Sequence, residues 1–217
     1  MGSVIYLHKG GQGEIEVKKS RFISSLNPAA NEEEAQAFIN EIKKKYWDAR
    51  HNCSAFVIGD KGELTRCSDD GEPSGTAGRP MLEVLKGSGV RNAVVTVTRY
   101  FGGVLLGTGG LVRAYSDAVR EGLNNSVIIE MTEGVLACAK MDYTDLSRLQ
   151  YIFSAPPFTV KDTVYEDKVE FSLLLPREEF EAMGRKVLES TGGRVELESK
   201  GLCRYGKAEG ELICNEL

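Results

Sequence analysis

Cysteine and histidine are scarce in this chain of 217 residues, which holds five cysteines and two histidines. No two of the cysteines stand in a Cys-x-x-Cys pair, so the sequence supports neither a structural zinc site nor a disulfide framework. We expect most of the cysteines to serve as small apolar side chains in a reducing compartment.

Long apolar runs are also missing. No segment approaches the roughly 20 apolar residues that a membrane-spanning helix requires. The first residues lack a basic stretch followed by a long apolar core, so we expect no signal peptide. The sequence therefore predicts a cytoplasmic protein that does not use the membrane as a partner.

The chain has no excess of positive charge, and its formal net charge is −5. Residues 1–130 balance 16 Lys and Arg against 16 Asp and Glu, whereas residues 131–217 hold 11 against 16. An acidic second half argues against nucleic-acid binding by bulk electrostatics there. Any RNA surface must therefore be a local one in the first half, and no DNA specificity is predicted.

The apolar pattern divides the chain into two predicted α+β domains, residues 1–130 and 131–217. Asn31, with Glu34 three positions later, predicts a capped helix start. The elements predicted around that helix are a strand at 13–26, a hairpin of 53–58 with 63–68, a helix at 80–86, a strand at 91–98 and a helix at 111–124. The second half reads strand, helix, strand, strand, helix, strand, which is the ferredoxin-like order.

The loop over residues 67–80 concentrates groups that bind ions. Its acidic and hydroxyl side chains are suited to a divalent cation, and the amides of residues 75–78, which lead into a helix, are suited to a phosphate. The alternative is an ordered turn in which Asp and Ser bind backbone N–H groups and Gly and Pro supply special dihedrals.

A second loop, residues 99–110, holds five glycines between a β-branched strand and a helix. It has the Gly spacing of a P-loop, but Thr108 stands where that motif needs Lys. The dinucleotide fingerprint fails as well, because Val112 stands where the last Gly or Ala belongs. The loop is either an anion-binding strand-to-helix turn or a tight turn without a ligand.

Three further residues, none of them a glycine, each allow one functional and one structural interpretation. Tyr100, beside Arg99, is suited to stacking on an RNA base, or packs in the core. Arg113 either reaches the same ligand or is a solvated charge. His51 is either a general base or a hydrogen-bonded packing residue.

These segments resemble the IMPACT family. The resemblance is carried by residues 70–82, which begin Asp-Gly-Glu-Pro-Ser-Gly-Thr-Ala-Gly-Arg-Pro, by residues 97–107, and by the shorter segment 49–56. It implies that the first domain is a β/α sandwich like domain 2 of ribosomal protein S5. It also implies that the second is a ferredoxin-like domain similar to domain V of elongation factor G. Eukaryotic members of the family regulate translation.

We therefore expect a non-enzymatic binding protein that acts in translation and contacts RNA or the ribosome through the two loops, which we expect to form one site. The alternative is an enzyme or sensor that binds a phosphorylated small molecule or nucleotide with Mg²⁺. A third reading is a protein-interaction module. The candidate RNA- or phosphate-binding residues are Ser74, Gly75, Thr76, Gly78, Arg79, Arg99, Tyr100, Gly102, Gly103, Gly107 and Arg113. The candidate metal or polar residues are Asp69, Asp70, Glu72 and His51. No cofactor is expected except Mg²⁺ under the alternative, and the sequence does not indicate an oligomeric state.

Overall fold

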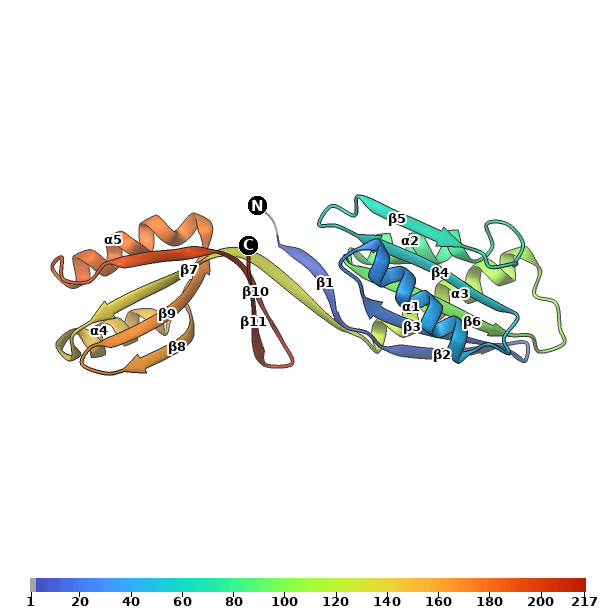
Figure 1. The fold of residues 1–217 in the computed structure, drawn as a ribbon, viewed down its shortest axis with the longest axis horizontal. Coiled ribbons are helices and arrows are strands. Elements are labelled where there is room, and N and C mark those ends of the chain that lie inside the picture. Colours follow the sequence, from blue (N-terminus) through green and yellow to red (C-terminus); the bar gives the residue numbers. More distant parts are fainter. Residues whose placement is uncertain (1–2) are drawn as a thin grey trace. The chain divides into compact units, whose positions relative to one another are not determined.

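The computed structural model describes residues 3–217, and the chain divides into two compact units (Figure 1). One unit is Val4–Glu130 and the other contains residues 131–217. Both mix helices with antiparallel sheet, which confirms the predicted two-domain α+β class. Among the described residues, no helix combines the length and apolar character needed to cross a bilayer.

The first unit is built on a five-stranded antiparallel sheet with the strand order β2-β3-β6-β4-β5. Its strands and helices are β1 (Val4–Lys9), β2 (Gln12–Val17), β3 (Ser20–Pro28), α1 (Glu32–Lys45), β4 (His51–Ile58), β5 (Leu64–Ser68), α2 (Gly78–Ser88), β6 (Ala93–Tyr100) and α3 (Gly107–Asn124). In Figure 1, α1 lies on one face of the sheet and α2 and α3 lie on the other.

Alternation along the central strands explains the two helical layers. Ala55 and Val57 of β4 point into the core shared with α2 and α3, whereas Phe56 and Ile58 point to the core under α1. Because side chains of a strand alternate between faces, a strand buried on both faces is apolar at nearly every position. β4 and β6 are such strands.

Local signals place the start of α1 as predicted. Asn31 Oδ1 accepts a hydrogen bond from the Glu34 amide at 2.8 Å, and Glu34 Oε2 accepts one from the Ala30 amide at 2.8 Å. This reciprocal arrangement satisfies amide groups that a helix start leaves unpaired.

Two predicted elements need correction. The single strand expected at 13–26 is a hairpin of β2 and β3, whose turn residues Lys18 and Lys19 have φ of +48° and +65°. The helix expected from residue 111 begins at Gly107, so the last glycines of the second loop form the first turn of α3.

The second unit has the strand order β11-β10-β7-β9-β8. Its elements are β7 (Val127–Met141), α4 (Tyr143–Phe153), β8 (Thr159–Tyr165), β9 (Val169–Pro176), the 3-10 turn η1 (Arg177–Glu179), α5 (Phe180–Ser190), β10 (Leu197–Ala208) and β11 (Glu211–Glu216). The four strands of the β-α-β-β-α-β motif are β7, β8, β9 and β10. If they are numbered 1 to 4 along the chain, their order in the sheet is 4-1-3-2. Leu149 and Phe153 of α4 and Val187 of α5 pack on one sheet face in a single core, so the helices share a layer.

Candidate functional site

The loop before α2 is closed by the carboxylate of Asp69. Its Oδ2 accepts a hydrogen bond from the Gly75 amide at 2.8 Å, and its Oδ1 accepts bonds from the amides of Ala77 at 3.0 Å and Gly78 at 2.8 Å. Burial works to raise the pKa of Asp69, but the three amide donors outweigh it and hold the pKa below its ordinary value. The amides expected to bind phosphate thus already have an anionic partner. Phosphate binding there stays a prediction, and it would require the Asp69 carboxylate to give up its hydrogen bonds to these amides.

Asp70 joins the same loop to α1 and β4. Its Oδ1 lies 2.7 Å from Lys43 Nζ, and its Oδ2 accepts a hydrogen bond from the Asn52 amide at 2.8 Å. His51 Nδ1 lies 2.9 Å from the Asp70 carbonyl oxygen. Because a carbonyl oxygen only accepts, Nδ1 carries the proton and is used to hold the loop.

Glu72 connects the two loops through a buried ion pair. Its Oε1 lies 2.7 Å from Arg99 NH1 and also accepts a hydrogen bond from the Tyr115 hydroxyl at 2.7 Å. The Glu72 and Arg99 side chains are 3% and 8% exposed. The guanidinium also lies over the rings of Phe22 and Phe101, 5.5 and 5.6 Å from their centroids. The two segments therefore meet, although the expected role of Arg99 as a surface contact is not compatible with this burial.

Cys53 extends this buried network. Its Sγ donates to the Asp69 carbonyl at 3.0 Å and lies 3.4 Å from the Tyr115 hydroxyl. Burial, with the nearby carboxylates, raises the pKa of Cys53 to about 12, so the thiol is protonated at neutral pH and is a poor nucleophile. The network holds the fold together rather than presenting reactive groups.

The three carboxylates of the first loop face different partners and do not converge. Asp69 faces the start of α2, Asp70 faces Lys43 and Glu72 faces Arg99. Over residues 3–217, no group of three or more His, Cys, Asp or Glu side chains is arranged to hold a metal ion. These residues do not fit a Mg²⁺ site. In the same loop, the buried Thr76 hydroxyl donates to the Pro73 carbonyl at 2.7 Å, whereas Ser74 is exposed.

The acidic side chains of the first loop bind partners within the protein, whereas the second loop exposes its side chains to solvent. We call the first loop closed and the second open. Phe101 is 55% exposed and Leu105 is 82% exposed. Gly102 packs against the turn between β2 and β3, because a Cβ there would lie 2.0 Å from the Lys19 carbonyl carbon. Gly103 and Gly107 have φ of +87° and +72°, which disfavours other residues, although each has open space where a Cβ would stand.

The loop belongs to a larger surface that we call the basic–aromatic end of the first unit. Gly102 N donates to Ser20 Oγ at 3.1 Å, the Tyr100 hydroxyl donates to Asp48 at 2.8 Å, and Arg21 lies over the Tyr100 ring at 5.9 Å. These contacts bring together the β2–β3 turn, the end of α1 and the end of β6. The surface consists of Lys18, Lys19, Arg21, Lys44, Lys45, Trp47, Arg50, Tyr100, Phe101 and Leu105.

Sequence reasoning missed most of this surface. Lys43, Lys44 and Lys45 suit the C-terminal dipole of a helix, which alone explains them. The sequence feature that could have indicated this surface is Trp47, the single tryptophan of the chain, two residues after that basic run. It is 82% exposed. Arg113 is also exposed, in the second turn of α3.

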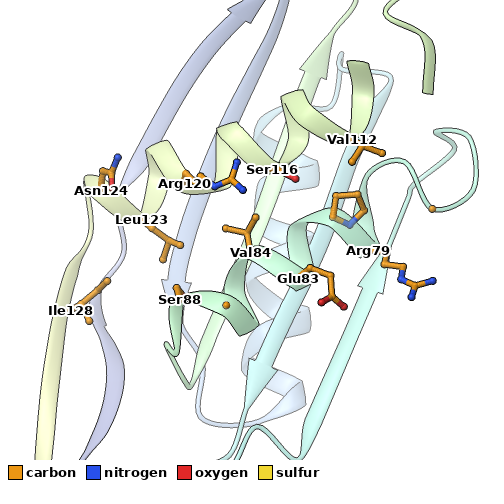
Figure 2. Close-up of a pocket in the computed structure, with 13 residues that line it drawn as sticks. Arg79, Glu83, Val84, Ser88, Val112, Ser116, Arg120, Leu123, Asn124 and Ile128 are labelled. Carbon is orange, nitrogen blue, oxygen red and sulfur yellow. The ribbon is translucent and has the colours of Figure 1, made fainter. Parts of the chain in front are cut away.

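A groove of about 890 Å³ lies between α2 and α3 (Figure 2). Gly75 and Arg79, two of the predicted site residues, line it together with apolar residues of both helices. Most of the predicted residues are therefore distributed over three places: the buried network, the loop at the basic–aromatic end and this groove.

Two family models match the chain: the Impact N-terminal domain at residues 18–123, and a domain of unknown function, DUF1949, at residues 140–194. IMPACT family member YvyE of Bacillus subtilis is 41% identical over 210 residues, covering 97% of each chain. IMPACT family member YigZ of Escherichia coli is 37% identical over 187 residues, covering 84% of this chain and 90% of the relative. The crystal structure of a hypothetical protein, 34% identical, matches with a TM-score of 0.59 and covers 91% of this chain and 97% of its own. With the two signature segments in contact and relatives that match nearly end to end, this chain belongs to the IMPACT family.

Proposed function

We propose that this protein is a non-enzymatic regulator of translation that acts in the cytoplasm and binds RNA, free or within the ribosome, through the basic–aromatic end of its first unit. The observation that carries the proposal is the coincidence of exposed cations and exposed aromatic rings around one glycine-rich loop. Membership of a family whose eukaryotic members regulate translation supports the biological setting.

Several cations gather at this end of the first unit, although one of them, Arg21, pairs with Glu14 at 2.7 Å. Residues 1–130 have no net charge, yet lysines and arginines from the β2–β3 turn, the end of α1 and the start of β4 gather in one region. Binding of a phosphate backbone depends on such local clusters and releases counterions, so its strength falls with salt. The net charge of −5 does not oppose a contact confined to this region.

The aromatic side chains point to single-stranded RNA. Trp47 and Phe101 expose large ring surfaces beside cations, which is the arrangement that stacks on unpaired bases. The first turn of α3 adds a feature suited to phosphate, because Leu106 stands at its N-cap position without a side-chain hydrogen bond. Helix amide groups left without a cap attract anions.

The alternative of a nucleotide enzyme or sensor has less support from the geometry. Its expected phosphate amides donate to Asp69, and its expected Mg²⁺ carboxylates face separate partners.

Fluorescence anisotropy with a labelled single-stranded RNA, over a series of salt concentrations, tests the proposal. The variant Lys18→Asn/Lys19→Asn removes two charges with a residue type that tolerates positive φ. It is expected to weaken binding and to reduce the slope of log affinity against log salt by about 0.7 for each phosphate that the protein no longer neutralises. Trp47→Ala is expected to weaken binding roughly 5- to 150-fold at any salt concentration, since stacking is worth about 1–3 kcal/mol per base.

The matched control is Lys61→Gln/Lys86→Gln. These exposed lysines lie in the β4–β5 turn and in the last turn of α2, away from the basic–aromatic end. The control is expected to bind as the parent protein does. Binding that is absent, or that both double variants reduce equally, would show that this surface is not the RNA contact.

A further inference from the structure

The groove between α2 and α3 is a second surface, separate from the basic–aromatic end. Residues of α2 line it at intervals of one turn, at Arg79–Pro80, Glu83–Val84 and Gly87–Ser88. α3 contributes Val112, Ser116, Arg120 and Leu123–Asn124, and Ile128 closes one end. In Figure 2, Val112 lies toward the Arg79 end, and Leu123 and Ile128 lie toward the Ser88 end, so the two helices flank the groove in parallel.

The lining exposes apolar side chains that the fold does not cover. Val112 is 38% exposed and Ile128 is 41% exposed, and the half-buried Val84 lies between the helices. The lining residues Gly87, Ser88 and Ser116 are small, so they project little from the outer surfaces of the two helices. The α2 side of the groove, from Arg79 to Ser88, is about 14 Å long at 1.5 Å per residue.

Shape favours an elongated occupant over a compact one. Sites for small molecules enclose most of the ligand surface, whereas this groove lies on the outer side of the helical layer and is open along its length. An amphipathic helix of two to three turns buries only one face, with apolar side chains at helical spacing, and fits a groove of this length and form.

Charge decides which amphipathic helix fits. The groove is flanked by Arg79 on α2 and Arg120 on α3, and Glu83 is the one acidic residue among the described residues that line it. Arg120 is 60% exposed although it pairs with Asp117, so its guanidinium remains accessible. Arg79 is exposed in the first turn of α2. Arginine on both sides of an apolar floor complements carboxylates on both edges of an apolar stripe.

We propose that this groove is a docking site for an amphipathic helix of a protein partner, which places its apolar stripe on Val84, Val112 and Ile128 and its acidic residues against Arg79 and Arg120. The site gives the protein a protein-binding surface on the same unit as the proposed RNA contact. The residues on which the RNA-binding proposal rests are different from the residues on which the docking proposal rests.

A charge-swap experiment tests the site with two designed peptides. Both are helices of about 14 residues with leucines at helical spacing, and they differ only in flanking Glu or Lys. Isotope-edited NMR of the full chain is expected to show the Glu peptide shifting signals of α2 and α3, with roughly tenfold tighter binding than the Lys peptide. The variant Arg79→Glu/Arg120→Glu is expected to reverse that preference, and a Glu in the first turn of α2 suits the helix dipole.

A second variant addresses the apolar floor at a partly exposed position. Val112→Gln changes a side chain that is 38% exposed, and it is expected to weaken both peptides at least fivefold while circular dichroism shows the fold of the parent protein. Equal binding of the two peptides, shifts located away from α2 and α3, or absence of binding would overturn the proposal. Self-association that Val112→Gln abolishes, or shifts of the groove residues Val84 and Ser88 produced by single-stranded RNA, would also overturn it, because the occupant of the groove would then be a second copy or RNA. RNA affinity is expected to be unchanged in Val112→Gln, which separates this test from that of the proposed function.

Discussion

The two glycine-rich loops of the first unit lead into helices on the same face of the sheet, yet they use their polar groups in opposite ways. The loop before α2 directs its acidic side chains inward, to the α2 amides, to β4 and to Arg99. The loop before α3 exposes Phe101, Val104 and Leu105, and its helix begins without a side-chain cap. A glycine-rich strand-to-helix loop is therefore not by itself a binding loop, because a single carboxylate such as Asp69 turns it into a structural one.

Substitutions in the two loops are expected to have different consequences. Changes in the closed loop are expected to reduce stability, and changes in the open loop are expected to reduce binding with little loss of stability. The buried pair of Glu72 and Arg99, which joins the loops, is expected to show the largest effect on stability.

Arg99→Ala is expected to lower the free energy of unfolding by about 3–5 kcal/mol, because it leaves the Glu72 carboxylate buried without its counter-ion. It also removes the guanidinium from over the rings of Phe22 and Phe101. Urea unfolding followed by circular dichroism measures the change.

The double variant Glu72→Gln/Arg99→Met separates pairing from packing. It removes both charges and keeps an acceptor for the Tyr115 hydroxyl, so its cost is expected to be smaller than the sum of the two single changes. A strictly additive result would mean that the two side chains do not interact, which contradicts the 2.7 Å contact.

Asp69→Asn is expected to cost about 1–2 kcal/mol, because the amide side chain offers one acceptor oxygen where the carboxylate serves three backbone donors. The folded pKa of Asp69 lies below its ordinary value of 3.8, so the unfolded chain takes up the proton first as pH falls. The stabilisation by Asp69 is thus complete well above pH 3.8 and disappears as pH falls through the folded pKa. Unfolding free energies of parent and variant should converge in acid.

Asp167→Asn is the control for this pH series, since Asp167 is exposed in the turn between β8 and β9. Its difference from the parent protein is expected to stay near zero throughout. If the Asp69→Asn difference persisted unchanged below the folded pKa, charge on Asp69 would not be what closes the loop.

Local chemistry explains what was predictable in this molecule. The Asn31–Glu34 cap and the β4–β5 hairpin depend on neighbours in sequence, and both form as expected. We expect the two signature segments to form one site, and Glu72 and Arg99, one residue from each segment, form an ion pair. Long-range partners were not predictable: nothing local marks Arg99 as buried, because its position depends on Glu72, 27 residues earlier.

The basic–aromatic end was not predictable for a different reason. Lys18 and Lys19 form a tight turn at positive φ, a conformation that Asn or Gly would have signalled and Lys does not. Because the apolar pattern predicts a single strand with at most a bulge around residues 18–21, it does not place the lysines beside Gly102. The cluster that unites three segments could therefore not be assembled from sequence.

Gly109→Ala gives the smallest and most discriminating effect. Gly109 lies in the first turn of α3 with helical φ, and nothing lies within 4 Å of the position that a Cβ would occupy, so the fold does not require glycine there. Alanine is expected to stabilise the protein by about 0.5–1 kcal/mol through its higher helix propensity. The matched control is Gly184→Ala in α5, where a Cβ also meets nothing within 4 Å. If the start of α3 approaches an RNA phosphate closely, Gly109→Ala should weaken RNA binding while it stabilises the fold, whereas Gly184→Ala should only stabilise. Equal RNA affinity in the two variants would place the phosphate contact on the lysines alone and leave the open start of α3 outside it.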